Sequence, residues 1–442
     1  MRRMVFAASL AALGCGGPGA PDPFAHSAHG NHRLGAAVGG RGSAASASAG
    51  SLARVDVSPT GDVRSLARAL DLAAPGATIM IHPGTYHEHG VAIDKPVTIM
   101  GHDFPTIDGD GQEILVVTAD DVTVRGLRLT NVATAFVKDA AALRVSDANG
   151  CVIENNRVDD AFFGIYLAQV NHCRVTANVL RASKGTEALS GNGIHLWTSR
   201  SITIANNEVK GHRDGIYFEF VHDSRIERNL SEGNLRYGLH FMYSDGCHYE
   251  GNTFRHNGSG VAVMYTKRVE MVNNTFENNW GAAAYGLLLK EIGDSRLEHN
   301  RFIRNSTGLL ADGANRLVAH GNVFADNGWA VRLDASTIEA RFTDNDFMGN
   351  TFDVATNNRE HTSSFNGNYW DDYAGYDLNR DGTGDVPYHP VRLFSLVVER
   401  HSPSIALLRS AFVTLLDAAE RALPSLTPET LVDPKPRMHR AS

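Results

Sequence analysis

One short pattern of polar and apolar positions returns along most of the chain. Each unit has an Asn, one further residue and an apolar residue, and about eight positions after the Asn comes a Gly that opens an alternating stretch. The Asn residues stand at positions 156, 178, 207, 229, 252, 274, 300, 322 and 345. The Gly residues stand at 164, 193, 215, 238, 260, 286 and 308, with Ala330 in the next unit. Two features that move together indicate a true repeat, with a commonest period of 22 residues.

The stretch after each Gly predicts a short strand. Gly164-Ile165-Tyr166-Leu167 and Gly260-Val261-Ala262-Val263 alternate buried and exposed positions, as strand residues must. A coil of this length with two or three short strands is typical of a parallel β-helix, in which every coil pairs with its neighbours. We therefore expect an all-β, right-handed parallel β-helix over residues 76–370. A leucine-rich repeat, the alternative solenoid, needs a Leu and Asn spacing that this sequence lacks.

The repeat Asn predicts a second feature of the coils. Asn tolerates left-handed backbone at a turn, and identical amides can stack into a hydrogen-bonded ladder. We expect the Asn column to do both.

Both ends of a solenoid need a cover, because an unpaired strand edge invites aggregation. Residues 63–74 predict an amphipathic helix that Pro75-Gly76 ends, so residues 55–75 are expected to form an N-terminal helical cap. Residues 405–423 have apolar side chains at helical spacing. Residues 391–442 are therefore expected to form a C-terminal helix and tail.

The N-terminus has the features of an export signal. A basic start precedes an apolar run over residues 4–13 that is too short to span a membrane, so residues 1–20 are expected to be a signal peptide. Cys15 follows small residues as in a bacterial lipobox, and the alternatives are lipid attachment at Cys15 or ordinary cleavage near Ala20. Residues 21–54 are rich in Ala, Gly, Ser and His and predict a flexible tether.

Composition narrows the range of partners. The 442 residues carry a formal net charge of −8, with 41 basic and 49 acidic residues spread along the chain, so there is no basic stripe to neutralise a phosphate backbone. We therefore expect no nucleic-acid partner.

Two columns of side chains should point outward from one sheet, if the apolar residue after each Gly points inward. The second residues after each Gly are Tyr166, His195, Tyr217, His240, Ala262 and Leu288. The fourth residues are Ala168, Trp197, Glu219, Met242, Met264 and Lys290. Coils stack about 4.8 Å apart, so Met242 and Met264 should be neighbours with His240 beside them. Thioether and imidazole ligands suit Cu(I), which makes these three residues a candidate for transient copper contact; packing under a loop or partner is the alternative.

Two further groups of histidines are candidates for metal capture. They are His82, His87 and His89 in the first coils, and His26, His29 and His32 in the tether. An ordinary polar surface and a soluble linker are the alternatives.

Three cysteines share one column, because Cys151, Cys173 and Cys247 each stand five residues before a repeat Asn. Cys151 and Cys173 lie on successive coils, and a spacing of about 4.8 Å falls within the usual Cα range for a disulfide. They are a candidate pair in an oxidising compartment. The alternative is a ladder of small buried residues, since Ser224 and Ser295 occupy the same column. Cys247 is expected to be a free buried thiol.

An Asp-rich loop at residues 371–390 follows the expected end of the β-helix. Its oxygen-bearing residues match alternate positions of an EF-hand-type calcium loop, although Tyr388 replaces the Glu expected at the last position. The candidate ligands are Asp377, Asn379, Asp381, Thr383 and Asp385. The alternative is a turn that binds no ion.

The same region resembles one family. Gly367-Asn368-Tyr369-Trp370-Asp371-Asp372, running into the Asp-rich loop and Pro387-Tyr388, is similar to the end of the β-helix in the NosD family. With the C-terminal helix and the tail, the resemblance covers roughly residues 60–436. It implies a periplasmic accessory protein that works with an ABC transporter and a copper-carrying lipoprotein to mature the copper centres of nitrous-oxide reductase. The C-terminal region exceeds what an end cover needs and is expected to contact the transporter.

The alternative function is a polysaccharide lyase, hydrolase or epimerase, because this fold is common among such enzymes. Glycoside hydrolysis needs two carboxylates across a groove, and the Asp-Asp pairs that begin at 120, 159 and 371 are expected at turns. We therefore expect no enzyme and assign no catalytic residue. A purely structural scaffold is the third alternative.

Overall fold

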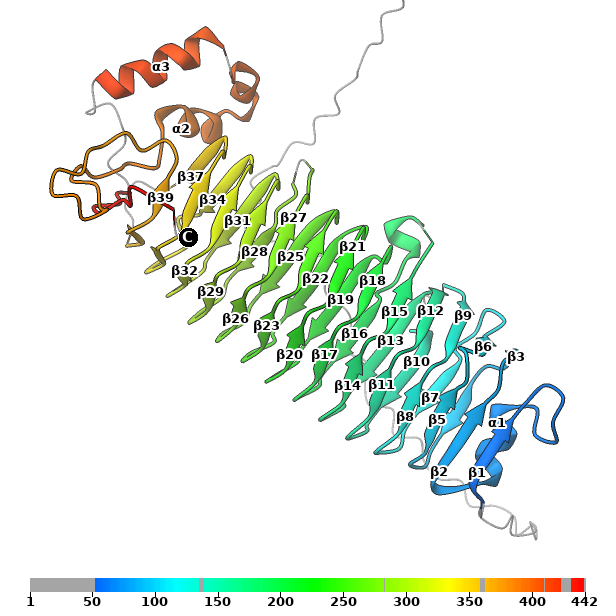
Figure 1. Ribbon diagram of the computed structural model, residues 1–442. Helices are drawn as coiled ribbons and strands as arrows, with labels where there is room; N and C mark the ends of the chain where they lie inside the picture. The colour runs from blue at the N-terminus through cyan, green and yellow to red at the C-terminus, as the bar shows by residue number, and fades with distance from the viewer. Residues whose placement is uncertain are drawn as a thin grey trace, which may run out of the picture. The chain divides into compact units, whose positions relative to one another are not determined.

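The described residues form a parallel β-helix of three sheets (Figure 1). The computed structural model describes residues 52–134, 139–183, 185–281, 283–357, 362–408, 410–422 and 431–440. The predicted signal peptide, Cys15 and nearly all of the predicted tether lie outside these residues. Within them, each sheet grows by one parallel strand per coil, so strands far apart in sequence order are neighbours in space. The predicted fold is confirmed.

Sheet A has 14 strands among the described residues: β1 (Leu52–Val57), β2 (Ala73–Ile81), β5 (Thr98–Gly101), β8 (Thr123–Arg125), β11 (Val152–Glu154), β14 (Arg174–Thr176), β17 (Thr203–Ala205), β20 (Arg225–Glu227), β23 (His248–Glu250), β26 (Glu270–Val272), β29 (Arg296–Glu298), β32 (Val318–His320), β35 (Arg341–Thr343) and β38 (Ser364–Asn366). Sheet B has 13 described strands: β3 (Thr85–His87), β6 (Thr106–Asp108), β9 (Arg128–Val132), β12 (Arg157–Ala161), β15 (Val179–Arg181), β18 (Glu208–Lys210), β21 (Leu230–Glu232), β24 (Thr253–Arg255), β27 (Thr275–Glu277), β30 (Arg301–Ile303), β33 (Val323–Ala325), β36 (Asp346–Met348) and β39 (Tyr369–Trp370). Sheet C has 12 described strands: β4 (Val91–Ile93), β7 (Leu115–Val117), β10 (Ala141–Ser146), β13 (Phe163–Ala168), β16 (Ile194–Trp197), β19 (Asp214–Glu219), β22 (Tyr237–Met242), β25 (Ser259–Met264), β28 (Leu287–Lys290), β31 (Thr307–Asp312), β34 (Trp329–Leu333) and β37 (Phe352–Thr356).

The interior is filled by stacks of identical or similar side chains, because equivalent positions of successive coils lie above one another. Sheet B contributes an aromatic stack in which neighbouring ring centroids lie 4.1 to 5.6 Å apart. Its members are Phe254, Phe276, Phe302, Phe324, Phe347 and Trp370, all fully buried. Stacked rings add about 0.5–1.5 kcal/mol per pair beyond their burial, so this stack stabilises the C-terminal coils.

The repeat Asn residues form the predicted ladder. Each Oδ1 accepts the backbone N–H and the Nδ2–H of the preceding Asn, and each Nδ2 also donates to a carbonyl, as at Asn207 and Asn229. The predicted left-handed backbone is wrong for the Asn itself. It belongs to the residue before, such as Asn206 with φ 57° and Arg228 with φ 51°. That residue makes the turn, which aims the next side chain inward.

This first ladder ends on an aspartate from the far end of the chain. The carboxylate of Asp433 accepts hydrogen bonds from the backbone and side chain of Asn368 and from Trp370 Nε1. A carboxylate needs no donor of its own, so it can terminate a one-way chain of amides.

A second ladder was not predicted from the sequence. It runs through Asn234, Asn257, Asn279, Asn305, Asn327 and Asn350. Its last amide donates to Asp353 Oδ1 at 3.3 Å, so this ladder also ends on a carboxylate.

The N-terminal cap is smaller than predicted. Helix α1 (Leu66–Leu72) buries Leu66, Ala69 and Leu70, and the Glu88 carboxylate accepts the first N–H groups of the helix. Strand β1 begins at Leu52, inside the predicted tether, because Val55 and Val57 alternate with polar residues and pair with β2.

The C-terminal cover contains more helices than predicted. Helix α2 (Leu393–Arg400) precedes the 3₁₀ helix η2 (Ser402–Leu407) and helix α3 (Ala411–Ala422), so residues 405–423 are not one helix. Phe394 and Val398 of α2 pack with Phe352 of β37. The tail at residues 431–440 binds the last coil through Asp433 and Arg437.

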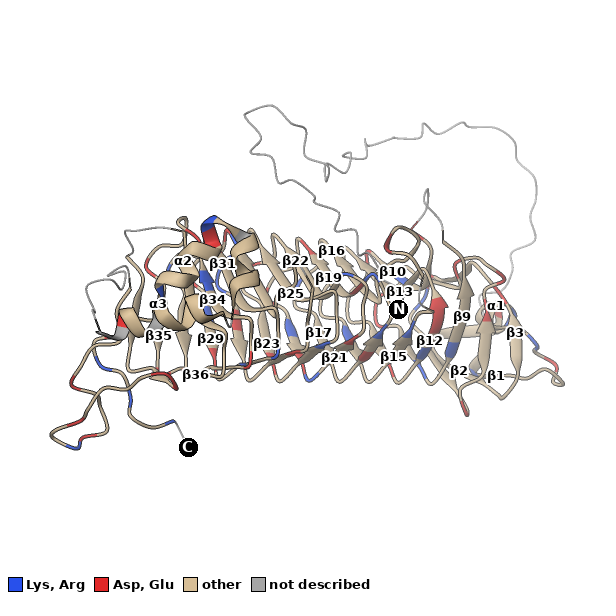
Figure 2. Ribbon diagram, turned by 90° about the horizontal axis from the view of Figure 1, so that it is seen from above, with Lys and Arg blue, Asp and Glu red and all other residues tan. Residues whose placement is uncertain are grey.

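The charge distribution and the helix lengths agree with what the sequence predicted. Figure 2 shows Lys and Arg interspersed with Asp and Glu along the coils, and pairs such as Arg128 with Asp159 bridge neighbouring coils. The described helices are all too short or too polar to cross a membrane.

Candidate functional site

The two predicted outward columns lie on sheet C. The register pairs Tyr217 with His240, and Met242 with Met264, on adjacent strands. The remaining pairs follow the predicted order from Tyr166 to Leu288 and from Ala168 to Lys290. His240 and Met242 are two residues apart on β22 and share one face, because side chains alternate along a strand. The structure therefore places the three candidate copper ligands on one face of two adjacent strands.

These columns are less exposed than an open surface site would be. His240 is only 7% exposed, and Met242 and Met264 are half-buried. The ring of His240 packs against those of Tyr217 and Tyr237, with centroids 5.1 and 4.8 Å away. The candidate contact is a nearly buried imidazole beside two half-buried thioethers.

A buried ion pair lies next to His240 and was not predicted from the sequence. Asp214 is fully buried, and the Arg236 guanidinium donates to it, with Nε 2.9 Å from Oδ1. Burial alone would raise the pKa of Asp214, but the hydrogen bonds from Arg236 and the proximity of the His240 imidazole lower it to about 2. Asp214 precedes the repeat Gly215, at a position that is apolar or uncharged in most other coils.

The imidazole of His240 keeps coordinating capacity. Its Nδ1 lies 3.8 Å from Asp214 Oδ2, which is too long for a hydrogen bond, and neither ring nitrogen has a hydrogen-bond partner among the described residues. Two coils earlier in the same column, burial lowers the pKa of His195 to about 3, so that ring is neutral at neutral pH. A neutral imidazole nitrogen is the form that binds metals.

An exposed aromatic stripe borders the two methionines. We call Phe220, Tyr243 and Tyr265 the aromatic stripe; each follows the Glu219, Met242 or Met264 position of its coil. The rings stack with centroids 5.2 Å apart and are 37 to 43% exposed. All three residues have left-handed backbone, with φ between 51° and 56°. The equivalent residues of other coils, such as Thr198 and Glu291, have the same backbone, so this conformation belongs to the turn of the coil.

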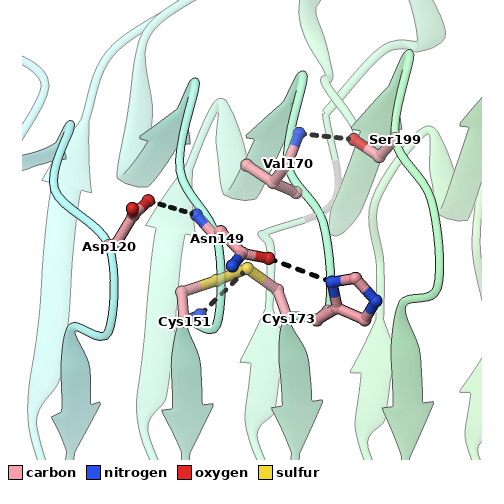
Figure 3. The surroundings of a disulfide bond; sticks show 7 residues. Asp120, Asn149, Cys151, Val170, Cys173 and Ser199 are labelled. Carbon is pink, nitrogen blue, oxygen red and sulfur yellow. Dashed lines mark hydrogen bonds between the residues drawn. A yellow bond between two sulfur atoms is a disulfide. The ribbon is translucent and has the colours of Figure 1, made fainter.

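The two cysteines meet on adjacent coils, as Figure 3 shows. Cys151 and Cys173 form a disulfide with Cα atoms 4.5 Å apart, and both are buried. Cys247 lies in the same column without a disulfide partner, and burial raises the pKa of its thiol to about 12. A thiol held protonated in this way is a weak nucleophile and a weak metal ligand.

The Asp-rich loop directs several of its carboxylates at its own backbone. Asp377 accepts from the N–H groups of Asp381 and Gly382, and Asp385 accepts from that of Leu378. Within the described part of the chain, the predicted ligands Asp377, Asp381 and Asp385 do not belong to a group of three ligand atoms within 4.8 Å. The loop has the residues of a calcium site in a turn held by internal hydrogen bonds.

Comparison with known proteins places these features in a family. The family described as periplasmic copper-binding protein (NosD) matches residues 181–375, which include all three candidate copper ligands. A probable ABC transporter binding protein NosD of Pseudomonas aeruginosa is 31% identical over 368 residues, covering 78% of this chain and 85% of that protein. This chain belongs to the NosD family.

A second NosD, from Stutzerimonas stutzeri, is 26% identical over 378 residues and covers 80% of this chain and 86% of that protein. The description of the NosD family supports a periplasmic location and copper as the metal for this member. The names of both relatives link NosD proteins to an ABC transporter.

Solved structures share the architecture of this NosD protein at low identity. PfbA, a surface adhesin of Streptococcus pneumoniae, is 12% identical with a TM-score of 0.50, over 74% of this chain and 92% of that chain. An α-1,3-glucanase from Streptomyces thermodiastaticus is 13% identical with a TM-score of 0.50, over 66% of this chain and 64% of that chain. At these identities, the likeness shows the β-helix fold alone.

Proposed function

We propose that this NosD-family protein is a periplasmic accessory protein that passes Cu(I) toward nitrous-oxide reductase and is not itself an enzyme. The observation that carries the proposal is the register pairing of Met242 with Met264 beside the His240 imidazole. Two thioethers and an imidazole are soft to borderline donors that suit Cu(I). Because these three residues leave a fourth position open, a partner can complete the coordination of the ion and then remove it.

The surroundings of the three ligands favour transfer over storage. The nearby carboxylate of Asp214 is engaged by Arg236, so it offers no hard ligand that would favour another cation. The aromatic stripe gives a partner an exposed surface directly beside the methionines, and aromatic side chains are frequent anchors of protein interfaces. The partner at this surface is the copper-carrying lipoprotein or the reductase, as the family resemblance implies.

The C-terminal cover supports a contact with the ABC transporter. Apolar side chains there remain exposed: Phe412 at 55% and Leu415 at 70% on α3, with Ile405 and Leu407 on η2 at 48% and 44%. Such a group of exposed apolar side chains is typical of a protein interface. Because the names of the relatives mention an ABC transporter, we assign the transporter as the partner of this apolar surface.

The carboxylates on β19 of sheet C argue against an enzyme. Two carboxylates, those of Asp214 and Glu219, lie at the two ends of β19. Arg236 holds Asp214 ionised, so Asp214 cannot be the protonated acid that glycoside cleavage requires, and the Glu219 carboxylate accepts a hydrogen bond from the Tyr217 hydroxyl. A polysaccharide-acting enzyme remains the alternative, and glycan cleavage by the purified protein would establish it.

Export and anchoring complete the proposal. Residues 1–20 act as the signal peptide, and lipid attachment at Cys15 is one of its two outcomes. Mass spectrometry of the mature N-terminus distinguishes the two outcomes, because a protein that begins at a lipidated Cys15 and one cleaved near Ala20 differ in mass.

The test replaces Met242 and Met264 together by Leu, which keeps volume and apolar character at a cost below about 1.5 kcal/mol per site. We expect the copper content of the reductase in cells to fall toward that of a strain lacking the protein. The matched control is Met80→Leu with Met100→Leu, a second half-buried pair in register on adjacent coils but on sheet A. If the Met242 and Met264 variant matures the reductase like wild type, these methionines are packing residues and the tether histidines become the leading candidates.

A further inference from the structure

One imidazole and two carboxylates converge at the N-terminal end of sheet B. His87 ends β3, Asp108 ends β6 on the next coil, and the two residues are direct partners in the register. Asp110 follows with left-handed backbone at φ 50°, and its Oδ1 lies 3.0 Å from His87 Nδ1. One ligand atom from each residue lies within 4.8 Å of the other two. The sequence pointed to His82 and His89 as companions of His87, but the fold brings carboxylates to it instead.

A residue outside the cluster holds it in shape. Asn131, on the following coil, donates to Asp108 Oδ1 at 2.7 Å, and the N–H of Asp110 donates to the same oxygen at 2.9 Å. In the described part of the chain, the side-chain hydrogen bonds of Asp108 and Asp110 involve Oδ1 of each carboxylate. Oδ2 of each is therefore open to a ligand. Hydrogen bonds from outer residues that orient a ligand are the usual support of a metal site.

The cluster also lacks a fixed positive charge. Among the described residues, the ion pair at Asp110 is with His87, and neither Asp108 nor Asp110 pairs with Lys or Arg. The other cluster of three ligand groups, Asp353 with Asp371 and Asp372, differs because Arg392 already binds Asp372. Arg392 supplies positive charge to the Asp353 cluster, whereas a bound cation would supply it to the His87 cluster.

We propose that His87, Asp108 and Asp110 bind a divalent transition-metal ion, with Cu²⁺ bound more tightly than Zn²⁺. An imidazole nitrogen disfavours Ca²⁺ and Mg²⁺, which take oxygen ligands, and two carboxylates disfavour Cu(I), which takes sulfur. Among divalent ions, such a site follows the series that peaks at Cu²⁺. The side chains of His87 and Asp110 are 62% and 49% exposed, which gives an ion access from solvent. The proposal does not rest on the proposed Cu(I) transfer at sheet C.

The experiment titrates the full-length protein with Zn²⁺ alone in a calorimeter. We compare wild type with His87→Gln and with Asp108→Asn, which keeps the oxygen that Asn131 and Asp110 contact. The matched control is His82→Gln, because His82 Nε2 lies 2.9 Å from Asp56 Oδ1 in a pair without a third ligand. The tether histidines are present in every variant, so their binding cancels in the comparison.

We expect His87→Gln and Asp108→Asn to lose one equivalent of Zn²⁺ or to bind it at least about tenfold more weakly, with unchanged metal-free melting temperatures. The His82→Gln control should bind like wild type. Wild-type stoichiometry and affinity in His87→Gln, or an equal loss in His82→Gln, would overturn the proposal.

Electron paramagnetic resonance of bound Cu²⁺ separates this site from the one on sheet C. The Cu²⁺ signal with one nitrogen ligand should disappear in His87→Gln and persist in the Met242→Leu, Met264→Leu variant. The reverse result would assign Cu²⁺ to sheet C and overturn the site proposed here.

Discussion

At the scale of single residues, ionisable groups next to the candidate sites are tuned by burial and by their partners. Asp214 stays charged in the interior because Arg236 bonds to it, and the nearby His240 ring keeps both nitrogens without hydrogen bonds. A buried carboxylate without such a partner behaves differently. Asp353, at the end of the second ladder, is the clearest case.

Asp353 predicts a pH-dependent stability of the C-terminal coils. Burial raises its pKa to about 7, and Asp371 and Asp372 add to this effect while Arg392 opposes it. A carboxyl with a folded pKa above its unfolded value stabilises the fold while protonated, so the contribution is full below about pH 4 and is lost as pH rises through 7. We expect the free energy of unfolding to fall by on the order of 2–3 kcal/mol from pH 5 to pH 8.

Denaturant unfolding of wild type and Asp353→Asn at both pH values measures this loss. The amide cannot ionise, so the variant should lose less stability than wild type over the same range. Equal pH dependence in the two proteins would show that Asp353 titrates like an ordinary surface carboxyl.

At the scale of elements, each coil is a repeated unit whose stability depends on its neighbours. The ladders, the aromatic stack and the cysteine column all join one coil to the next at equivalent positions. Local cross-links should therefore stabilise pairs of coils.

The cysteine pair is such a cross-link. We predict that Cys151 and Cys173 are bridged in the exported protein, which stabilises their coils by about 3 kcal/mol for a loop of this length. Mass spectrometry without reduction should find both thiols protected from alkylation and Cys247 alkylated only after unfolding. Two freely alkylated thiols at 151 and 173 would reject the bridge.

The Asp-rich loop follows the last strand, β39, and contacts the C-terminal tail, where the Gly384 N–H donates to the Pro436 carbonyl. A cation that binds only the folded loop raises the melting temperature by mass action, so we predict that calcium stabilises the wild type and that Asp381→Ala loses this gain. The control is Asp103→Ala, an exposed turn residue far from the loop. If a chelator leaves the wild-type melting curve unmoved, the loop is a turn held by its own hydrogen bonds.

At the scale of the whole molecule, the C-terminal cover closes the β-helix and contains the proposed docking surface. The tail closes the first Asn ladder through Asp433, so truncation at Pro424 would remove part of the fold while leaving α3 in the chain. Helix α3 has an exposed apolar face that the ladder does not need. Point variants on α3 therefore separate docking from folding.

We predict that Leu415→Asp abolishes co-purification with the ABC transporter while leaving the melting temperature unchanged. Leu415 is 70% exposed, so a carboxylate there costs little in the free protein but is costly in an apolar interface. The matched control is Leu189→Asp, at an apolar side chain 53% exposed near the middle of the solenoid. Retention of the transporter by Leu415→Asp would move the contact elsewhere.

The sequence by itself determined the coil and most of what lies in register with it. The 22-residue repeat and the alternation within each strand are local patterns, so they predicted the β-helix, the outward columns that contain His240, Met242 and Met264, and the shared column of Cys151 and Cys173. Side chains at equivalent positions of adjacent coils must meet, because parallel strands stack at a fixed spacing.

Only the tertiary structure decided how those positions are surrounded. The burial of His240, the Arg236 bond to Asp214 and the meeting of His87 with Asp108 and Asp110 depend on turn lengths and backbone angles that the repeat does not encode. The repeat also could not predict the contact of the tail with the last coil, because Asp433 and Asn368 are 65 residues apart in the sequence. A repeat predicts which residues share a column, whereas contacts between columns arise only once the chain has folded.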